Sequence, residues 1–464
     1  MPFTAQITFL QIRQALARRL YDPNMVFWTD AELKTHIWNA MRFWNVLAGE
    51  WKKWFALELN SASGYGVGGY GLGGYGVGQP GIWYDLFQIA NTPRTVFLND
   101  TDVYGWMQYL LLEPQNPVFN PASPPTTLQF QIADFTQAVQ RKRDEFLMRT
   151  GCTRIIETIN VNPLTPTISL PEKVIQALRG YWLPIAGGVP FPLVRINEYA
   201  AQTFSPFSQQ NPGNPQSFSA GTDPQLIVNL YPPPSIPGVI EFITIEAQGA
   251  LGISGVGGVS PFPLFIPQDF APALMWGAFA DILGSGMEQQ DESRAQYAQQ
   301  RFEQFVQLMD SYPFVLAARN AGIPMQVDGV EALDIWNPNW RNLNANPTIL
   351  ATAGQNLIGC PTNADKFIDL FMLSNALLPV LDADIIQLGY EVIDVLVDMA
   401  FHESMFRCGG TEFLDTLPQF QSMIKLAAER NARVRALSTF RDVLYGRTLR
   451  EDLIKARAVQ LETS

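Results

Sequence analysis

Both ends of the chain show apolar residues at helical spacing. Residues 5–21 place apolar side chains three and four positions apart, which predicts a short helix. Thr29 followed by Glu32 three positions later is a capping-box pattern, and it predicts the start of a long amphipathic helix that runs to about Phe55. The apolar face of this second helix consists of Leu33, Ile37, Ala40, Met41, Trp44 and Leu47.

The middle of the chain changes to short apolar runs separated by Gly- and Pro-rich breaks. We expect one helix over 132–150, ended by Gly151, and another helix over 172–183. The other runs are typical of strands and cover 153–161, 166–170, 191–196, 225–231 and 238–246. The middle is therefore expected to be rich in β-structure.

The pattern becomes helical again after Pro267. An almost wholly apolar segment from Phe270 predicts a buried helix. The helix that follows has one apolar side, made of Tyr297, Phe302, Phe305, Val306 and Met309. Residues 320–362 show no regular pattern, whereas 380–407 and 411–437 predict further helices.

These patterns predict an α+β fold dominated by helices. N-terminal and C-terminal helical bundles would flank a β-rich middle that carries long Gly/Pro-rich loops. We expect five regions along the chain: an N-terminal helical region (1–60), a Gly-Tyr repeat loop (61–81), a mixed α/β middle region (82–265), a helical hairpin (266–320) and a C-terminal helical region (321–464).

Residues 61–81 contain three tandem copies of Gly-Tyr-Gly-Val/Leu-Gly. Glycine weakens helices and strands, so we expect a loop whose Tyr65, Tyr70 and Tyr75 can contact a neighbouring subunit. The string GYGVGG matches the dinucleotide fingerprint GxGxxG literally. That fingerprint follows a strand and opens a helix, whereas here a helix precedes it and the pattern repeats, so low complexity explains the match.

The composition favours a chain that is covered by other chains. Charged residues make up 16% of the sequence, against roughly 25% in a typical soluble domain, and aromatic residues make up 12%. The cores of protein–protein interfaces are likewise poor in charged residues and rich in aromatic residues. A core role is the simpler interpretation of the aromatic stretch near the N-terminus, but we also take four of its rings as interface candidates: Trp28, Trp38, Trp44 and Trp51.

The charge balance argues against a protein that binds nucleic acid through its phosphates, because the net charge is −12. The charge is compatible with a protein surface that DNA passes without binding to it. One basic cluster lies near the C-terminus and includes Arg447 and Arg450. We expect it to dock on an acidic partner surface rather than on nucleic acid.

The strongest candidate for chemistry is the series Asp394, Asp398 and His402, spaced four residues apart along one helix face. It could be half of a metal site in a helical bundle, but neither HExxH nor the diiron Glu-x-x-His spacing is present. A polar stripe that pairs with arginines on a neighbouring helix is the favoured interpretation. We therefore expect no catalytic residue, cofactor or metal, and the sequence lacks both GxxxxGK[ST] and GxSxG.

The cysteines and the termini give further expectations. Cys152, Cys360 and Cys408 form no CxxC pair, so buried free thiols are expected. The N-terminus does not resemble a signal peptide, and no uninterrupted apolar run approaches the roughly 20 residues that span a bilayer. We expect no membrane partner.

Three segments carry motifs that can be compared with known proteins. Residues 28–55 read WTDAELKTHIWNAMRFWNVLAGEWKKWF, a helix entered through a tryptophan. From Leu230 the chain reads LYPPPSIPGVIEF, and residues 266–308 combine a P-x-D-F entry, a buried helix and the pattern D-x-x-R-A-x-Y-x-x-x-R, which contains Arg294 and Arg301. Together with DVLVDMAFHESMFRCGGTEF (394–413), these segments resemble virion neck proteins of tailed bacteriophages, of the head–tail connector or adaptor type.

The resemblance implies a structural virion protein that forms a homo-oligomeric ring at the head–tail junction. Such a ring would join the portal protein to tail or fibre proteins, and DNA would pass through its lumen during ejection. The chain would be made in the cytoplasm of the host bacterium and end in the neck or tail, with Arg294 and Arg301 as further interface candidates. Two alternatives stay open: another tail component, such as a tail tube, nozzle or fibre-attachment protein, and a virion-associated hydrolase that uses carboxylates.

Overall fold

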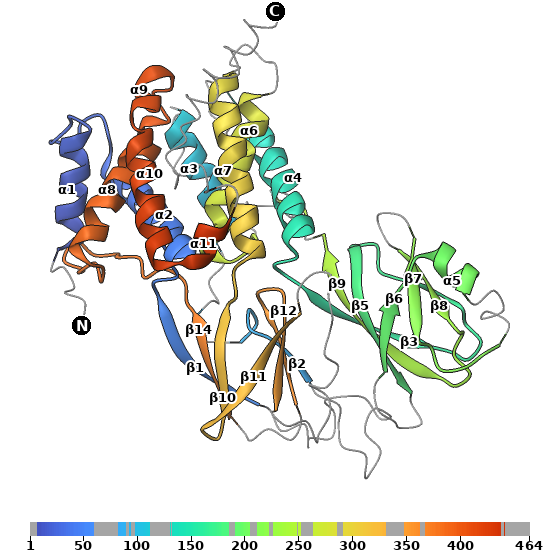
Figure 1. The fold of residues 1–464 in the computed structure, drawn as a ribbon. Coiled ribbons are helices and arrows are strands. Elements are labelled where there is room, and N and C mark those ends of the chain that lie inside the picture. The colour runs from blue at the N-terminus through green and yellow to red at the C-terminus, as the bar shows by residue number, and fades with distance from the viewer. Residues whose placement is uncertain are drawn as a thin grey trace, which may run out of the picture.

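The computed structural model describes the chain over fifteen stretches: residues 7–59, 82–89, 92–93, 98–111, 130, 132–184, 191–204, 211–221, 226–247, 249–251, 263–284, 291–330, 348–361, 367–437 and 440. A layer of helices lies above one curled sheet, and a second curled sheet projects to the side (Figure 1).

The helical layer combines helices from the beginning, the middle and the end of the chain. Helix α6 packs against α4 and α7, whereas α8 packs against α2 and α10. The layer contains α1 (Phe9–Arg19), α2 (Asp30–Ala48), α3 (Asp100–Leu111), α4 (Ile132–Thr150), α6 (Ala271–Leu283), α7 (Glu292–Asp310), α8 (Tyr390–Met405), α9 (Gly410–Asp415), α10 (Leu417–Arg430) and α11 (Ala432–Ala436).

The sheet beneath the helices, called sheet A here, has seven strands in the order β1-β14-β10-β11-β12-β13-β2. Neighbouring strands are antiparallel except β11 and β12, which are parallel. Its strands are β1 (Lys52–Glu58), β2 (Ile82–Asp85), β10 (Val315–Asn320), β11 (Ile323–Val330), β12 (Ile349–Ala353), β13 (Leu357–Cys360) and β14 (Phe367–Leu373).

The second sheet, sheet B, also has seven strands, in the order β3-β9-β5-β6-β7-β8-β4, and it occupies the chain between α4 and α6. The short helix α5 (Glu198–Phe204) contacts its strand β7. Its strands are β3 (Ile155–Val161), β4 (Thr167–Ser169), β5 (Val174–Pro184), β6 (Phe191–Arg195), β7 (Ser217–Ala220), β8 (Ile227–Tyr231) and β9 (Gly238–Glu246).

The two sheets join through an apolar cluster and one buried amide. Tyr181 and Ile243 of sheet B pack with Ile349 and Leu357 of sheet A. Close by, the side chain of Asn356 accepts a hydrogen bond from the backbone N–H of Arg154 and donates one to its carbonyl oxygen, both at 2.9 Å. Because Asn356 is fully buried, these two bonds fix the start of β13 against the start of β3.

The expected helix-dominated fold with separate terminal bundles is wrong. The structure has two large curled sheets, and sheet A takes strands from both ends of the chain. Helix α2 ends at Ala48 and not near Phe55, because Gly49 adopts a left-handed conformation with φ 61° and closes the helix. The chain then enters β1, which pairs with β14.

Two further sequence expectations are wrong. The segment 172–183 holds strand β5 instead of a helix, and register shifts lie between Val174 and Gln176 and between Ala177 and Arg179. These irregularities replace the two-residue alternation of a strand by a three-residue spacing, which imitates a helix. The segment 320–362, expected to be irregular, contains β11, β12 and β13.

The C-terminal helices are shorter than expected. Helix α8 begins at Tyr390, and residues 380–389, which the structure describes, form no helix. The expected helix over 411–437 is divided into α9, α10 and α11, with Pro418 in the first turn of α10 and Asn431 capping α11.

Candidate assembly surfaces

The four tryptophans proposed as interface candidates lie against other parts of the same chain. Trp28, Trp44 and Trp51 are buried in the core of the helical layer. Trp38 is half-buried, and its indole N–H donates a hydrogen bond to the carbonyl oxygen of Pro379 at 2.9 Å. Their large apolar area therefore stabilises this chain, and a docking surface has to be sought among other side chains.

Arg301 is an internal cation. Only 1% of it is exposed, and its guanidinium lies 4.1 Å from the ring centre of Phe43 and 4.4 Å from that of Phe420. It also donates a hydrogen bond to Gln304 Oε1 at 2.7 Å. Burial lowers the pKa of Arg301, and the aromatic faces of α2 and α10 compensate part of that cost.

Arg294 links α7 to the end of α8. Its Nε contacts Asp291 Oδ2 at 2.7 Å, and its Nη1 donates to the carbonyl oxygen of Phe406 at 3.3 Å. The other proposed interface residues, Tyr65, Tyr70, Tyr75, Arg447 and Arg450, lie outside the described residues and stay predictions.

The series Asp394, Asp398 and His402 does not converge on one point. Asp394 is exposed, and Asp398 forms an ion pair with Arg19 of the neighbouring helix α1. His402 is buried, with Nε2 2.6 Å from the hydroxyl of Tyr297 and Nδ1 2.6 Å from the hydroxyl of Thr416.

The tautomer of His402 follows from its partners. The Thr416 hydroxyl donates its proton to the carbonyl oxygen of Phe413 at 2.6 Å, so it accepts from Nδ1–H. Nε2 is then an acceptor for the Tyr297 hydroxyl. Burial lowers the pKa of His402 to about 3, and the positive charge of Arg301 acts in the same direction. His402 is thus a neutral core histidine whose two ring nitrogens are both occupied.

A buried polar network that the sequence analysis missed lies one residue further on. The Glu403 carboxyl is 3.1 Å from His36 Nδ1 and accepts a hydrogen bond from Asn39 Nδ2 at 3.0 Å. Asn39 in turn accepts from Arg42 Nη1 at 2.8 Å. The network fixes α2 against α8, and no local pattern could reveal it because Glu403 is more than 360 residues from His36 and Asn39.

The cysteines show no sign of an activated thiolate. Cys152 and Cys360 are buried, as expected for free thiols, whereas Cys408 is exposed. Burial is the main cause that raises the pKa of Cys408, and the Glu412 carboxylate adds to it. A raised pKa keeps the thiol protonated and unreactive at neutral pH.

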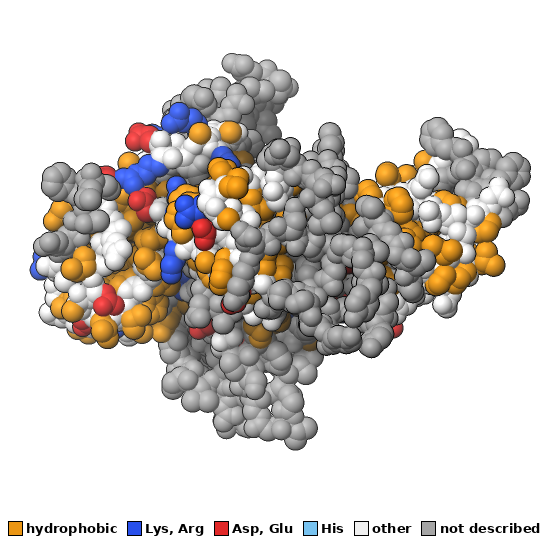
Figure 2. Space-filling model, turned by 90° about the horizontal axis from the view of Figure 1, so that it is seen from below, with side chains coloured by type: hydrophobic (Ala, Val, Ile, Leu, Met, Phe, Trp, Pro, Cys, Tyr) orange, Lys and Arg blue, Asp and Glu red, His pale blue; other side chains and the backbone are white. Residues whose placement is uncertain are grey.

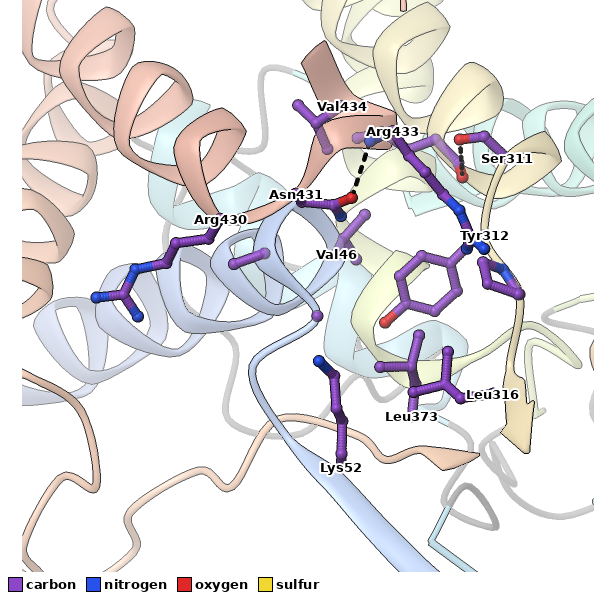
Figure 3. Close-up of a pocket in the computed structure, with 14 residues that line it drawn as sticks. Val46, Lys52, Ser311, Tyr312, Leu316, Leu373, Arg430, Asn431, Arg433 and Val434 are labelled. Atoms are coloured by element: carbon purple, nitrogen blue, oxygen red, sulfur yellow. Dashed lines mark hydrogen bonds between the residues drawn. The ribbon is translucent and has the colours of Figure 1, made fainter. Parts of the chain in front are cut away.

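A cavity of about 180 Å³ lies where the helical layer meets sheet A (Figure 3). The ends of α2 and α7, the start of β1 and the α10–α11 junction form it. Its apolar wall consists of Val46, Leu308, Leu316, Leu373 and Val434. Figure 3 shows the ammonium group of Lys52 and the hydroxyl of Tyr312 directed toward the same space.

The rim of this cavity is basic. Arg430 is committed to ion pairs with Glu50 at 2.9 Å and Glu391 at 2.5 Å. Lys52 and Arg433 are exposed, and within the described part of the chain neither forms an ion pair. Among the described residues that line the cavity, none is acidic. The cavity therefore combines an apolar wall with two cations that are available to a partner.

A second unusual surface is the loop of residues 377–385, between β14 and α8. Its residues 380–385 belong to the segment expected to be helical, where their apolar side chains would have faced a core. Instead it exposes large aliphatic side chains to solvent: Leu377 (56%), Val380 (71%), Leu381 (66%) and Ile385 (53%). Figure 2 shows apolar side chains gathered at the end of the molecule where α1 lies, beside which this loop runs.

The 377–385 loop is held in place by many hydrogen bonds. The Asp384 carboxylate accepts from the backbone N–H groups of Val380 at 2.8 Å and Leu381 at 2.7 Å. The loop is tied to α1 by a bond from the N–H of Phe9 to the carbonyl oxygen of Asp384 at 2.9 Å, and Asp382 pairs with the buried Arg13. Its exposed apolar surface is therefore a fixed feature of the fold.

The P-x-D-F motif anchors the start of this loop. Asp269 lies in a short 3₁₀ helix, η1 (Gln268–Phe270), and is buried. Its carboxylate accepts from Asn45 Nδ2 at 2.6 Å and from the backbone N–H of Ala376 at 3.1 Å. The motif thus joins α2, η1 and the beginning of the loop, a structural task that the sequence analysis did not assign.

Comparisons with known proteins give one finding. Residues 110–321 match the family described as SU10 adaptor protein, which covers less than half of the chain, from the end of α3 through sheet B and α7 to β10. The match supports a phage adaptor or neck protein and does not distinguish a subtype. No curated protein matches the chain. Within the described residues, no helix is both long and apolar enough to cross a membrane.

Proposed function

We propose that this chain is a structural adaptor subunit of a tailed-phage virion. In this proposal, copies of the chain form a ring at the head–tail junction, bind the portal on one side and tail or fibre proteins on the other, and surround the path of the DNA. The match of residues 110–321 to the adaptor family carries the proposal. The chain would act by binding alone and would be found in the virion.

The buried polar side chains of α8 support a binding role. His402 is neutral and bonded through both ring nitrogens, and Glu403 is held by His36 and Asn39. These groups fix helices relative to one another and are shielded from solvent. A rigid frame of this kind suits a subunit that must present surfaces in a constant orientation.

The charge of the chain fits a ring around moving DNA. A net charge of −12 repels the phosphate backbone of DNA. Binding through phosphates and the release of their counterions is then disfavoured, so DNA could pass without being bound.

The proposal is tested by mixing the purified protein with the portal protein of the same phage and imaging the mixture by negative-stain electron microscopy. We expect a ring of additional density on one face of the portal. Particles identical to portal alone, with the chain left as compact monomers, would contradict the proposal.

A further inference from the structure

We propose that the 377–385 loop of one copy docks into the basic cavity beside Lys52 and Arg433 on a second copy. This inference rests on the proposed function in one respect: it assumes that the chain assembles with itself. It adds the surfaces through which assembly occurs. Both surfaces are otherwise unexplained, because neither an exposed rigid apolar loop nor two cations beside an apolar cavity stabilises a single chain.

The loop has the properties of an anchor. Four aliphatic side chains project from it into solvent, and exposed apolar surface in a fixed conformation is typical of an interaction site. Its backbone is already held by Asp384, by Phe9 and by the Arg13–Asp382 pair. Docking would therefore cost little additional conformational entropy.

The cavity has the size and lining to receive such an anchor. A volume of about 180 Å³ exceeds the roughly 150 Å³ that accommodates a benzene-sized group in an engineered apolar cavity. One aliphatic side chain, such as Leu381, can enter between Leu316, Leu373 and Val434. Its neighbours on the loop would then cover the rim and exclude water.

Charge complementarity identifies a second copy of this chain as the occupant. The loop carries Asp382 and Asp384 and no basic residue, and Asp382 is 59% exposed although it pairs with Arg13. The cavity presents Lys52 and Arg433. Copies with a net charge of −12 repel one another, so contact needs a local pairing of acidic with basic surface, and these two surfaces supply one.

The contact is heterologous, because the loop and the cavity are different surfaces. Each copy would use its loop toward one neighbour and its cavity toward the other. Such contacts generate a closed ring when the rotation between copies closes, and an open filament when it does not.

The test uses two double variants of the full chain. The loop variant carries Val380→Asp and Leu381→Asp, and the cavity variant carries Lys52→Glu and Arg433→Glu. Leu164→Asp is the control, because Leu164 is 67% exposed but lies in the turn between β3 and β4 of sheet B, remote from both surfaces. Circular dichroism melting establishes that each variant folds, and native mass spectrometry with and without portal protein measures assembly.

We expect each double variant alone to lose self-association by about tenfold or more, whereas the Leu164→Asp control assembles like the unaltered chain. The most discriminating measurement is made on a one-to-one mixture of the two double variants. Each partner retains one intact surface, so the mixture should yield heterodimers and no larger ring.

Other outcomes separate this inference from the proposed function. If both double variants assemble normally, the interface lies elsewhere while the adaptor ring stands. If the mixture yields no heterodimer, the pairing of loop with cavity is wrong. If the cavity variant forms rings but no longer joins the portal, the cavity binds a different virion protein. If the unaltered chain assembles under neither condition, the proposed function itself fails.

Discussion

At the scale of single residues, His402 shows how burial decides between a metal ligand and a core side chain. Its spacing with Asp394 and Asp398 suggested a shared site, but the helix carries the three residues into different surroundings. Asp394 is exposed, Asp398 pairs with Arg19, and His402 bonds to Tyr297 and Thr416. Residue types at the right spacing are therefore not sufficient evidence of a site.

The buried His402 predicts a specific loss of stability at mildly acidic pH. Its pKa is about 3 in the folded chain and about 6.5 when unfolded. Below pH 6.5 His402 is protonated in the unfolded chain but stays neutral in the folded chain. The free energy of unfolding therefore has its full value above pH 6.5 and falls as the pH decreases. Between pH 6 and 5 the loss should approach about 1.4 kcal/mol per pH unit, measured by chemical denaturation.

His402→Gln is the control for this prediction. Glutamine can donate to Thr416 and accept from Tyr297, yet it does not titrate. Carboxyl groups with lowered pKa, such as Asp291 and Glu303, lose stabilisation only nearer pH 4, below this window. Equal pH slopes for the unaltered chain and His402→Gln between pH 6 and 5 would show that His402 does not titrate in this way.

Arg301 permits a separate test of a buried charge. Arg301→Met keeps the contacts with Phe43 and Phe420 and removes the charge, so the free energy of unfolding should change by less than about 1 kcal/mol or increase. Arg301→Ala leaves a cavity and should lower the free energy of unfolding by about 2–4 kcal/mol. Urea denaturation of both variants measures the difference, and an equally large loss in Arg301→Met would mean that the charge itself is stabilising.

At the scale of secondary-structure elements, signals that lie within a single element could be predicted. The capping box of Thr29 and Glu32 is present at the start of α2, and α4 spans the expected 132–150. Strand β5 was missed because its register shifts give it a helical spacing. The 377–385 loop was missed because its aliphatic side chains resemble the core face of a helix.

Pairings between distant elements could not be predicted at all. Sheet A places β1 beside β14, and Glu403 meets His36 and Asn39, although hundreds of residues separate these partners. A local sequence pattern does not show which of several strands or helices will pair. The candidate surfaces depend on these pairings and therefore could not be predicted from the sequence. The P-x-D-F motif is visible in the sequence, but the contact of its Asp269 with Asn45, 224 residues away, exists only in the folded chain.

The central strands of sheet B depend on one glycine. A Cβ atom at Gly238 would lie 2.2–2.8 Å from ring atoms of Trp182, which is fully buried. Gly238→Ala should therefore lower the midpoint of thermal unfolding and the free energy of unfolding by about 1–3 kcal/mol. Gly249→Ala, where no atom lies within 4 Å of the new Cβ, is the matched control. Equal melting curves for the two variants would mean that the ring moves aside without cost.

At the scale of the whole molecule, the adaptor-like segment supplies one complete sheet and part of the helical layer. The matched residues 110–321 supply sheet B and the helices α4, α6 and α7, whereas α1, α2, α8, α10 and most of sheet A come from outside the match. Both proposed docking surfaces draw on this added part, through the 377–385 loop and through Lys52 and Arg433. The elaboration around the segment would thus carry the contacts between subunits.

The central claim is that the chain is a ring-forming structural subunit, and native mass spectrometry of its complex with portal protein tests it most directly. Each bound copy adds 51.8 kDa, so the account predicts a complex heavier than the portal by a fixed multiple of that mass. A portal that gains no mass, together with the chain as a 51.8 kDa monomer at every concentration tested, would contradict it.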